Sequence, residues 1–150
     1  MLLTDALLAW VHFVLIFALA GCLFAEVVFY REVLAGPTFE RLRAVDRAYG
    51  MLAGAVVLSG IARMVYSPKT AGYFLHNPIF WTKMSLFVVV ALLSIPPTLH
   101  FLRLSSTAQP DGTVRVERTV YVRMRALLTA QVTLLVLIPL CAALMARGFH

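Results

Sequence analysis

Charged side chains are scarce in this sequence. Of 150 residues, only 13% are Asp, Glu, Lys or Arg, whereas 61% are hydrophobic and the mean hydropathy is +0.88. Soluble domains carry about 25% charged and about 45–50% apolar residues, so this chain cannot cover a water-facing surface. The composition therefore argues against a soluble enzyme, and the abundance of apolar residues argues against disorder.

Metal-binding patterns are also missing. The sequence has only two cysteines, Cys22 and Cys141, and both fall inside hydrophobic runs, where small packing residues are expected rather than a disulfide or metal pair. It contains no H-x-x-x-H, no C-x-x-C and no acidic cluster, so a zinc or di-iron site lacks ligands. A Ser-His-Asp pattern and a phosphate-cradling glycine loop are absent as well.

Long hydrophobic runs dominate what is present. A helix needs about 20 apolar residues to cross the hydrocarbon core of a bilayer, and four stretches qualify. We therefore expect one all-α domain over residues 1–150, an integral membrane four-helix bundle. Its expected spans are residues 6–30, 49–65, 79–102 and 127–146.

The basic residues predict the orientation of this bundle. Nine of the thirteen Lys and Arg residues flank the first and third connections, and such an excess is typical of cytoplasmic loops. Both termini are therefore expected outside the cytoplasm (N-out, C-out), with anionic lipids on the cytoplasmic side as partners and no nucleic acid. The nine are Arg31, Arg41, Arg43, Arg47, Arg103, Arg115, Arg118, Arg123 and Arg125.

Ionisable groups inside a span mark a functional site by default, and His12 is the first of them. It stands roughly 10 Å inside the first span, and the topology returns Arg63, Tyr73, His76 and Lys83 to the same side. Haem needs one or two axial His or Met ligands and a dry pocket. We therefore expect a haem b site with His12 as one ligand to the iron, and Arg63 and Lys83 on the propionates. His76 or a methionine (Met64, Met84 or Met145) is the candidate second ligand. A hydrogen bond from His12 to another helix and an aromatic belt are the simpler interpretations.

A second polar cluster is expected near the cytoplasmic boundary. Glu26 follows His12 by fourteen residues, which places both on one face of the first helix, roughly 21 Å apart. Its expected neighbours include Arg43, Asp46 and Tyr49. The favoured role of Glu26 is a structural ion pair with an arginine, and a proton path is the alternative.

The connections carry three further expectations. Residues 39–45 form a short amphipathic stretch, and Val116, Val120 and Met124 recur every four residues, as in a cytoplasmic extension of the fourth helix. Residues 66–78 are expected to form an ordered cap over the bundle. The pair Gly50 and Gly54 favours close packing within the bundle over a dimer interface.

Several motifs together resemble domain of unknown function 2214, a family of small predicted bacterial membrane proteins without an established activity. The resemblance implies a multi-pass protein of the bacterial inner (cytoplasmic) membrane. The motifs are His76-Asn77-Pro78-x-Phe80-Trp81-x-Lys83, Ser94-Ile95-Pro96-Pro97-Thr98, Ile138-Pro139-Leu140 with Leu144-Met145-Ala146-Arg147-Gly148, and Asp46-x-x-Tyr49-Gly50.

A weaker likeness links the chain to HemJ-type protoporphyrinogen oxidases and CopD-like membrane proteins. His12, Ala20-Gly21, Phe29-Tyr30 and Trp81-x-Lys83 are similar to the HemJ pattern. The resemblance implies haem b on His12. Arg31 replaces the His of that pattern and residues 87–95 contain no His, so the implication extends to haem binding and not to protoporphyrinogen oxidation.

Two functions from different classes follow. The first is a haem-b redox protein with His12 as axial ligand, and its alternative is a small cofactor-free transporter, channel or structural assembly protein. The alternative would use His12 and Glu26 with Gln131 and Thr133 of the fourth helix. A homodimer or a membrane redox partner is the expected protein partner, and enzymatic activity is left open.

Overall fold

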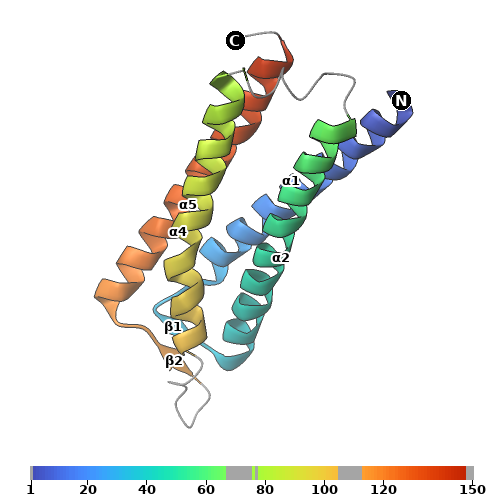
Figure 1. Ribbon diagram of the computed structural model, residues 1–150. Helices are drawn as coiled ribbons and strands as arrows, with labels where there is room; N and C mark the ends of the chain where they lie inside the picture. Colours follow the sequence, from blue (N-terminus) through green and yellow to red (C-terminus); the bar gives the residue numbers. More distant parts are fainter. Residues whose placement is uncertain (1, 67–75, 77, 105–112, 148–150) are drawn as a thin grey trace.

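The protein is a bundle of four long helices (Figure 1). The computed structural model describes residues 2–66, 76, 78–104 and 113–147. All four helices are long and apolar enough to cross a membrane, which confirms the predicted all-α membrane architecture. They are α1 (Leu2–Phe29), α2 (Gly36–Tyr66), α4 (Pro78–Leu104) and α5 (Arg118–Ala146), with the strands β1 (Val33–Leu34) and β2 (Val114–Arg115).

The helices form two antiparallel pairs. α1 packs mainly against α2 and α4 mainly against α5, contacts between α1 and α5 join the pairs, and α2 and α4 make few contacts. The start of α1 and the end of α5 lie at one end of the bundle, which we call the terminal end (Figure 1). The two strands lie at the opposite end, which we call the ribbon end. The weak α2–α4 packing leaves one side of the bundle loosely closed.

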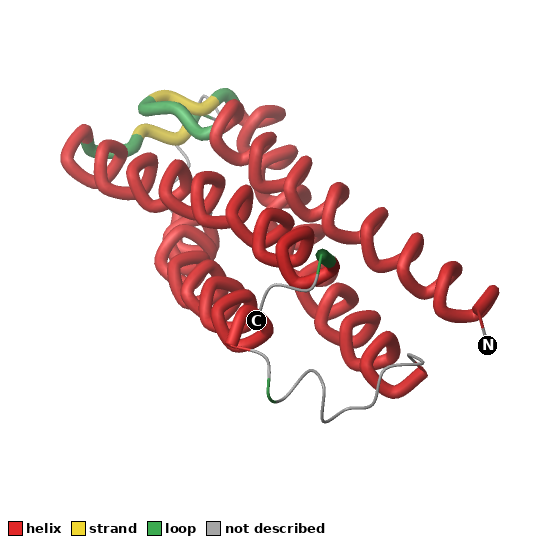
Figure 2. Tube along the Cα trace, turned by 90° about the horizontal axis from the view of Figure 1, so that it is seen from above, coloured by secondary structure: helices red, strands yellow, loops and turns green. Residues whose placement is uncertain are grey.

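The two strands are an element that sequence reasoning missed. β1 and β2 pair antiparallel, with Val33 opposite Arg115 and Leu34 opposite Val114, and lie side by side at the ribbon end (Figure 2). The Val116 N–H extends the pairing by donating to the Glu32 carbonyl at 2.9 Å. Because β1 follows α1 and β2 precedes α5, the ribbon ties the two helix pairs together.

α2 and α5 are longer than the hydrophobic runs that predicted them, and both extend further toward the ribbon end. α2 begins at Gly36, so the amphipathic stretch 39–45 is its first part, with Phe39 and Leu42 buried in the core. α5 begins at Arg118, which confirms a helical extension over Val120 and Met124, and Met124 is buried there. Val116, which the expected repeat also included, lies before the helix and pairs with Glu32. Burial of these apolar residues beneath the ribbon explains why both helices continue past the membrane-length segment.

Prolines inside α4 are accommodated by a neighbouring helix. Pro97 has no N–H, so the carbonyl four residues before it, that of Leu93, loses its helical partner. Gln131 of α5 is fully buried and donates from Nε2 to that carbonyl at 3.2 Å. Membrane helices tolerate proline where a side chain from a neighbouring helix satisfies the freed backbone group.

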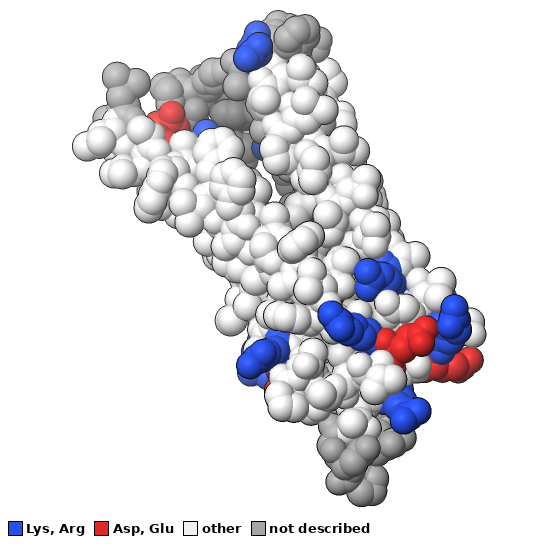
Figure 3. Space-filling view, turned by 180° about the vertical axis from the view of Figure 1, so that it is seen from behind, with Lys and Arg blue, Asp and Glu red and all other residues white. Residues whose placement is uncertain are grey.

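Charge is segregated along the bundle. On the face seen in Figure 3, most of the visible charged side chains gather at the ribbon end, and the middle is almost free of them. Large apolar side chains such as Trp10, Phe17 and Phe24 are exposed on α1. An apolar girdle with a basic end is the surface that a bilayer requires.

Candidate functional site

Two polar sites lie along the contact between α1 and α2. His12 hydrogen-bonds to α2 through Ser59, and Glu26 interacts electrostatically with Asp46 and Tyr49 of α2. Both α1 residues therefore face the same neighbour, which agrees with the shared helix face expected from their spacing. The His12 site is nearer the terminal end and the Glu26 site is nearer the ribbon end.

The His12 ring is held by one hydrogen bond. Its Nδ1 lies 2.7 Å from Ser59 Oγ, and Ser59 donates its single proton to the Val56 carbonyl at 3.0 Å. His12 Nδ1 is therefore the donor, and the lone pair of the neutral imidazole is on Nε2. A Cβ built on Gly60 would lie 3.4 Å from His12 Cε1, at the edge of ordinary van der Waals contact, so the ring packs closely on α2 and leaves no room for a side chain larger than that of alanine.

Two of the expected cationic residues lie near this ring. Arg63 of α2 and Lys83 of α4 are both within electrostatic range of His12. The Arg63 guanidinium lies 5.9 Å from the centre of the Phe13 ring, and the Lys83 ammonium lies 5.2 Å from that of Phe80. Among the described residues, the buried Arg63 Nε has no hydrogen-bond partner.

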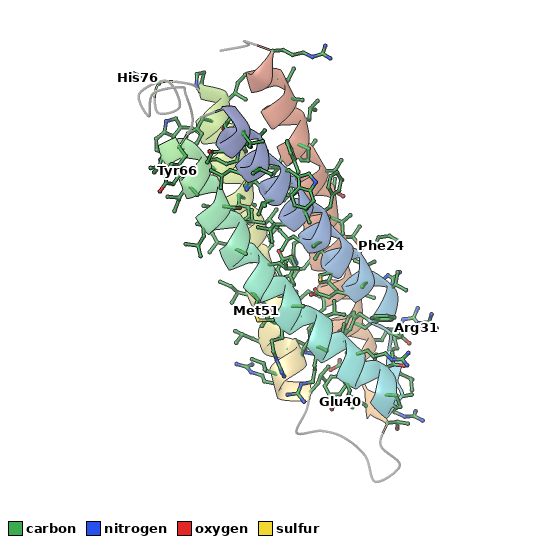
Figure 4. All side chains as sticks on the ribbon, turned by 90° about the vertical axis from the view of Figure 1, so that its right-hand side faces the viewer. Phe24, Arg31, Glu40, Met51, Tyr66 and His76 are labelled. Carbon is green, nitrogen blue, oxygen red and sulfur yellow. The ribbon has the colours of Figure 1, made fainter. Side chains whose placement is uncertain are left out.

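In the described part of the chain, the structure does not place the other residues of the expected haem site beside the His12 ring. His76 is exposed and precedes α4, which begins at Pro78, and it lies at the same end of the bundle as Tyr66 (Figure 4). Tyr73 and the expected cap over residues 66–78 fall almost wholly outside the described residues. Met64 and Met84 are half-buried on α2 and α4.

Glu26 departs from its expected role. Its side chain is buried, with 2% of the residue exposed, and its Oε1 has no hydrogen-bond partner among the described residues. The expected ion pair with an arginine is wrong for the described part of the chain, where Glu26 forms none. Arg43 instead pairs with Glu40 at 3.7 Å.

Arg125 explains why a nearby arginine does not reach Glu26. Its guanidinium donates to the carbonyls of Val27 and Tyr30 at 3.4 and 3.5 Å and to the Tyr121 hydroxyl at 3.1 Å. These carbonyls are at the C-terminal end of α1, where a cation also complements the helix dipole. The Arg125 guanidinium therefore binds the last carbonyls of α1, and among the described residues the Glu26 carboxyl has no cation beside it.

Asp46 and Tyr49 connect the Glu26 site to α4. Thr98 Oγ1 donates to Asp46 Oδ1 at 2.6 Å, and Tyr49 is hydrogen-bonded to the side chain of Ser94. These contacts bridge the two helices that otherwise pack weakly. The Asp46 carboxyl and the Tyr49 hydroxyl are within electrostatic range of the Glu26 carboxyl.

A cavity of about 300 Å³ opens between α2 and α4 beside these bridges. Its polar lining comes from Arg43, Asp46, Arg47, Tyr49, Ser94 and Thr98, and its apolar lining includes Ala53, Phe87, Val90 and Phe101. A second, shallower hollow near the start of β1 is lined by Phe29, Arg31 and Val33 among others. His12 lines neither cavity.

An aromatic cluster next to this site was not anticipated from the sequence. Tyr30 is completely buried, its ring stacks on that of Tyr121 at 5.4 Å, and its hydroxyl lies 3.0 Å from His100 Nε2. Burial raises the pKa of the Tyr30 hydroxyl, and the nearby Tyr121 adds to the effect. The only sequence signal was a tyrosine at the end of the first span. The cluster joins α1, α4 and α5 and holds the ribbon end together.

Four helices of membrane length and apolar composition define a multi-pass membrane protein. The chain belongs to the family of predicted membrane proteins DUF2214, whose model matches residues 4–150. The family resemblance drawn from the sequence motifs is thereby confirmed, and the family description assigns no activity. No curated protein and no solved structure matches the chain. The likeness to HemJ-type proteins stays a prediction.

Proposed function

We propose that this protein is a small cofactor-free membrane carrier in which Glu26 exchanges a proton. The observation that carries the proposal is the burial of Glu26 in a membrane-length helix with no partner for Oε1 among the described residues. An unpaired charged carboxylate in such a place is strongly disfavoured. A neutral carboxyl that takes up and releases a proton accounts for its presence.

The surroundings of Glu26 supply one side of a proton path. Asp46 is within electrostatic range of Glu26 and lines the cavity between α2 and α4, whose polar part is at the ribbon end. A proton arriving from water at that end would reach Asp46 first and Glu26 second. Tyr49 is next to both groups and adds a hydroxyl to the same path.

The contact between α1 and α2 favours a carrier over an open channel. Leu19 and Leu23 are buried on α1 between His12 and Glu26, and Val56 is buried on α2. Together these apolar side chains separate the two polar sites. A carrier needs such a barrier because its site must open to one side at a time.

The test is proton exchange across proteoliposomes that contain a pH-sensitive dye. After an acid pulse, we expect the wild-type protein to equalise the pH faster than protein-free vesicles do. Glu26→Gln keeps the shape of the side chain and removes its exchangeable acid, so the rate should fall to that of protein-free vesicles. Glu117→Gln, at an exposed position just before α5, is the matched control and should keep the wild-type rate. Equal rates for wild type and Glu26→Gln would refute the proposal.

A haem-b redox role is the second candidate, and the geometry of His12 favours it. The bond to Ser59 fixes the ring and leaves the Nε2 lone pair available, and iron-ligating histidines are oriented in this way. Arg63 and Lys83 are within range to hold propionates. The fit is partial, because neither cavity is lined by His12 and His76 is exposed. Protein purified after expression with ample haem should show a Soret band that His12→Ala removes, and a colourless protein would eliminate this candidate.

The orientation is part of the proposal. The nine arginines at the connections support a cytoplasmic ribbon end in a bacterial inner membrane, with both termini on the opposite side. Reporter fusions to the C-terminus test this orientation. Reporter activity in the cytoplasm would reverse it.

A further inference from the structure

The geometry points to a binding site for one anionic phospholipid in the cavity between α2 and α4, with its phosphate at Arg43 and Arg47 and one acyl chain beside Phe87 and Val90. This inference deepens the proposed function, since it names the species that the carrier would bind.

The lining changes from charged to apolar along the cavity. Arg43, Arg47 and Asp46 are at the ribbon end, and Ala53 of α2 with Phe87 and Val90 of α4 are further toward the middle of the bundle. From residue 43 to residue 53, α2 rises roughly 15 Å. A lipid presents the same order of groups over such a length, with an anionic head at the bilayer surface and hydrocarbon below it.

The charges at the head of the cavity favour an anion. The lining there holds two arginines and only one carboxyl, that of Asp46, so its net charge is positive. The Asp46 carboxyl accepts a hydrogen bond from Thr98. The pair between Arg43 and Glu40 spans 3.7 Å and has an exposed glutamate, so it holds the arginine only weakly. The Thr98 and Ser94 hydroxyls also line the cavity, and each already donates its proton within the protein, to Asp46 Oδ1 and to the Ala91 carbonyl, so the arginines are the groups left to bind the phosphate.

The room in the cavity comes from small residues. Gly50 and Ala53 line it from α2, and nothing lies within 4 Å of a Cβ built on Gly50. The expected close packing around Gly50 and Gly54 is therefore wrong for the described part of the bundle, since Gly54 has no such neighbour either. A cavity of about 300 Å³ is at the lower limit of ligand sites. It is too small for two acyl chains and holds part of one.

Native mass spectrometry of the full chain in detergent tests the site with two probes, phosphatidylglycerol and phosphatidylcholine. We expect the wild type to retain one phosphatidylglycerol, and the double variant Arg43→Gln/Arg47→Gln to bind it at least about tenfold more weakly. Arg41→Gln/Arg123→Gln is the matched control for charge, because both arginines are exposed and neither lines the cavity. Equal retention of phosphatidylcholine by the wild type would overturn the inference.

A second pair of variants tests the acyl chain. Gly50→Leu fills the cavity and should abolish retention without unfolding, because the new side chain meets no neighbour at its Cβ. Gly21→Leu adds the same side chain on α1, also with nothing within 4 Å and away from the cavity, and should bind as the wild type does. Unchanged retention by Gly50→Leu would overturn the inference. So would a wild-type dimer that Gly50→Leu converts to monomer, because a second copy would then cover this face.

The two proposals fail separately. Lipid retention in detergent needs no proton exchange, and Glu26 does not line the cavity, so Glu26→Gln should retain phosphatidylglycerol as the wild type does. If the protein retains phosphatidylglycerol but does not exchange protons, the lipid site stands and the proton carrier is refuted. Proton exchange without selectivity for phosphatidylglycerol refutes the lipid site alone.

Discussion

His12 and Glu26 occupy the same face of α1 and contact the same helix, yet their surroundings are opposite in kind. His12 has a partner in Ser59, which passes the hydrogen bond on to the Val56 carbonyl. Glu26 is more deeply buried and its Oε1 has no partner among the described residues. His12 Nδ1 has its hydrogen bond, whereas Glu26 Oε1 has none among the described residues.

This difference separates a structural explanation from a functional one. A satisfied hydrogen bond across two helices stabilises their packing, so His12 and Ser59 are accounted for by the fold itself. An unsatisfied buried acid lowers stability, so the fold does not account for Glu26. The proposed proton exchange accounts for Glu26, because a lone carboxyl can take up and release a proton.

The largest expected effect comes from removing the acid. Glu26→Leu eliminates a buried group without a partner and replaces it with an apolar side chain of similar size. We expect the variant to be more stable than the wild type by about 3 kcal/mol and inactive in proton exchange. Denaturation in detergent measures the stability, with Glu117→Leu as the exposed control. A less stable variant would mean that Glu26 is a structural residue, and the contrast with His12 would disappear.

The next effect concerns the glycine beneath His12. A Cβ on Gly60 already lies 3.4 Å from the His12 ring, so the larger Gly60→Leu side chain must push α1 and α2 apart. We expect a loss of about 2 kcal/mol in the free energy of unfolding. Gly54→Leu, on the same helix with nothing within 4 Å, is the matched control and should be close to neutral. Similar losses in both variants would show that the His12 contact is no tighter than the rest of α2.

The helical framework was predictable because it depends on hydrophobicity along the chain. Four apolar runs of membrane length and the four-residue repeat before the last run indicated α5 and its extension correctly. The common face of His12 and Glu26 followed from helix geometry alone. These features need no knowledge of which side chains meet.

The unpredicted features depend on contacts between distant segments. β1 and β2 are two residues each and pair across about 80 residues, so neither strand shows a periodic pattern. The isolation of Glu26 depends on Arg125 turning to the carbonyls of Val27 and Tyr30, and the cavity depends on the spacing of α2 and α4. Sequence spacing brings candidate residues together, and it does not decide which donor takes which acceptor.

A smaller effect is expected from the hydrogen bond between His12 and Ser59. Ser59→Ala leaves His12 Nδ1 without its acceptor, and we expect a loss of about 1 kcal/mol. His12→Phe should make the serine substitution nearly neutral, because the donor is then gone. The coupling energy from this double-mutant cycle, measured by denaturation, isolates the bond. A coupling energy of zero would place His12 in the same class as Glu26.

The smallest expected effect concerns Gln131, which with Glu26 makes up the buried polar residues of the described part of the chain. Its Nε2 donates to the Leu93 carbonyl that Pro97 leaves free, so a requirement of the backbone explains this residue. Gln131→Leu should lower the free energy of unfolding by about 0.6 kcal/mol, a typical value for a hydrogen bond between membrane helices. Pro97→Ala restores an N–H for Leu93, and in that background Gln131→Leu should have no effect on the unfolding measured in detergent. If the loss persists with Ala at position 97, the bond from Nε2 to the Leu93 carbonyl is not what Gln131 contributes, and the backbone explanation of this residue is wrong, because removal of the unpartnered Oε1 would raise stability and not lower it.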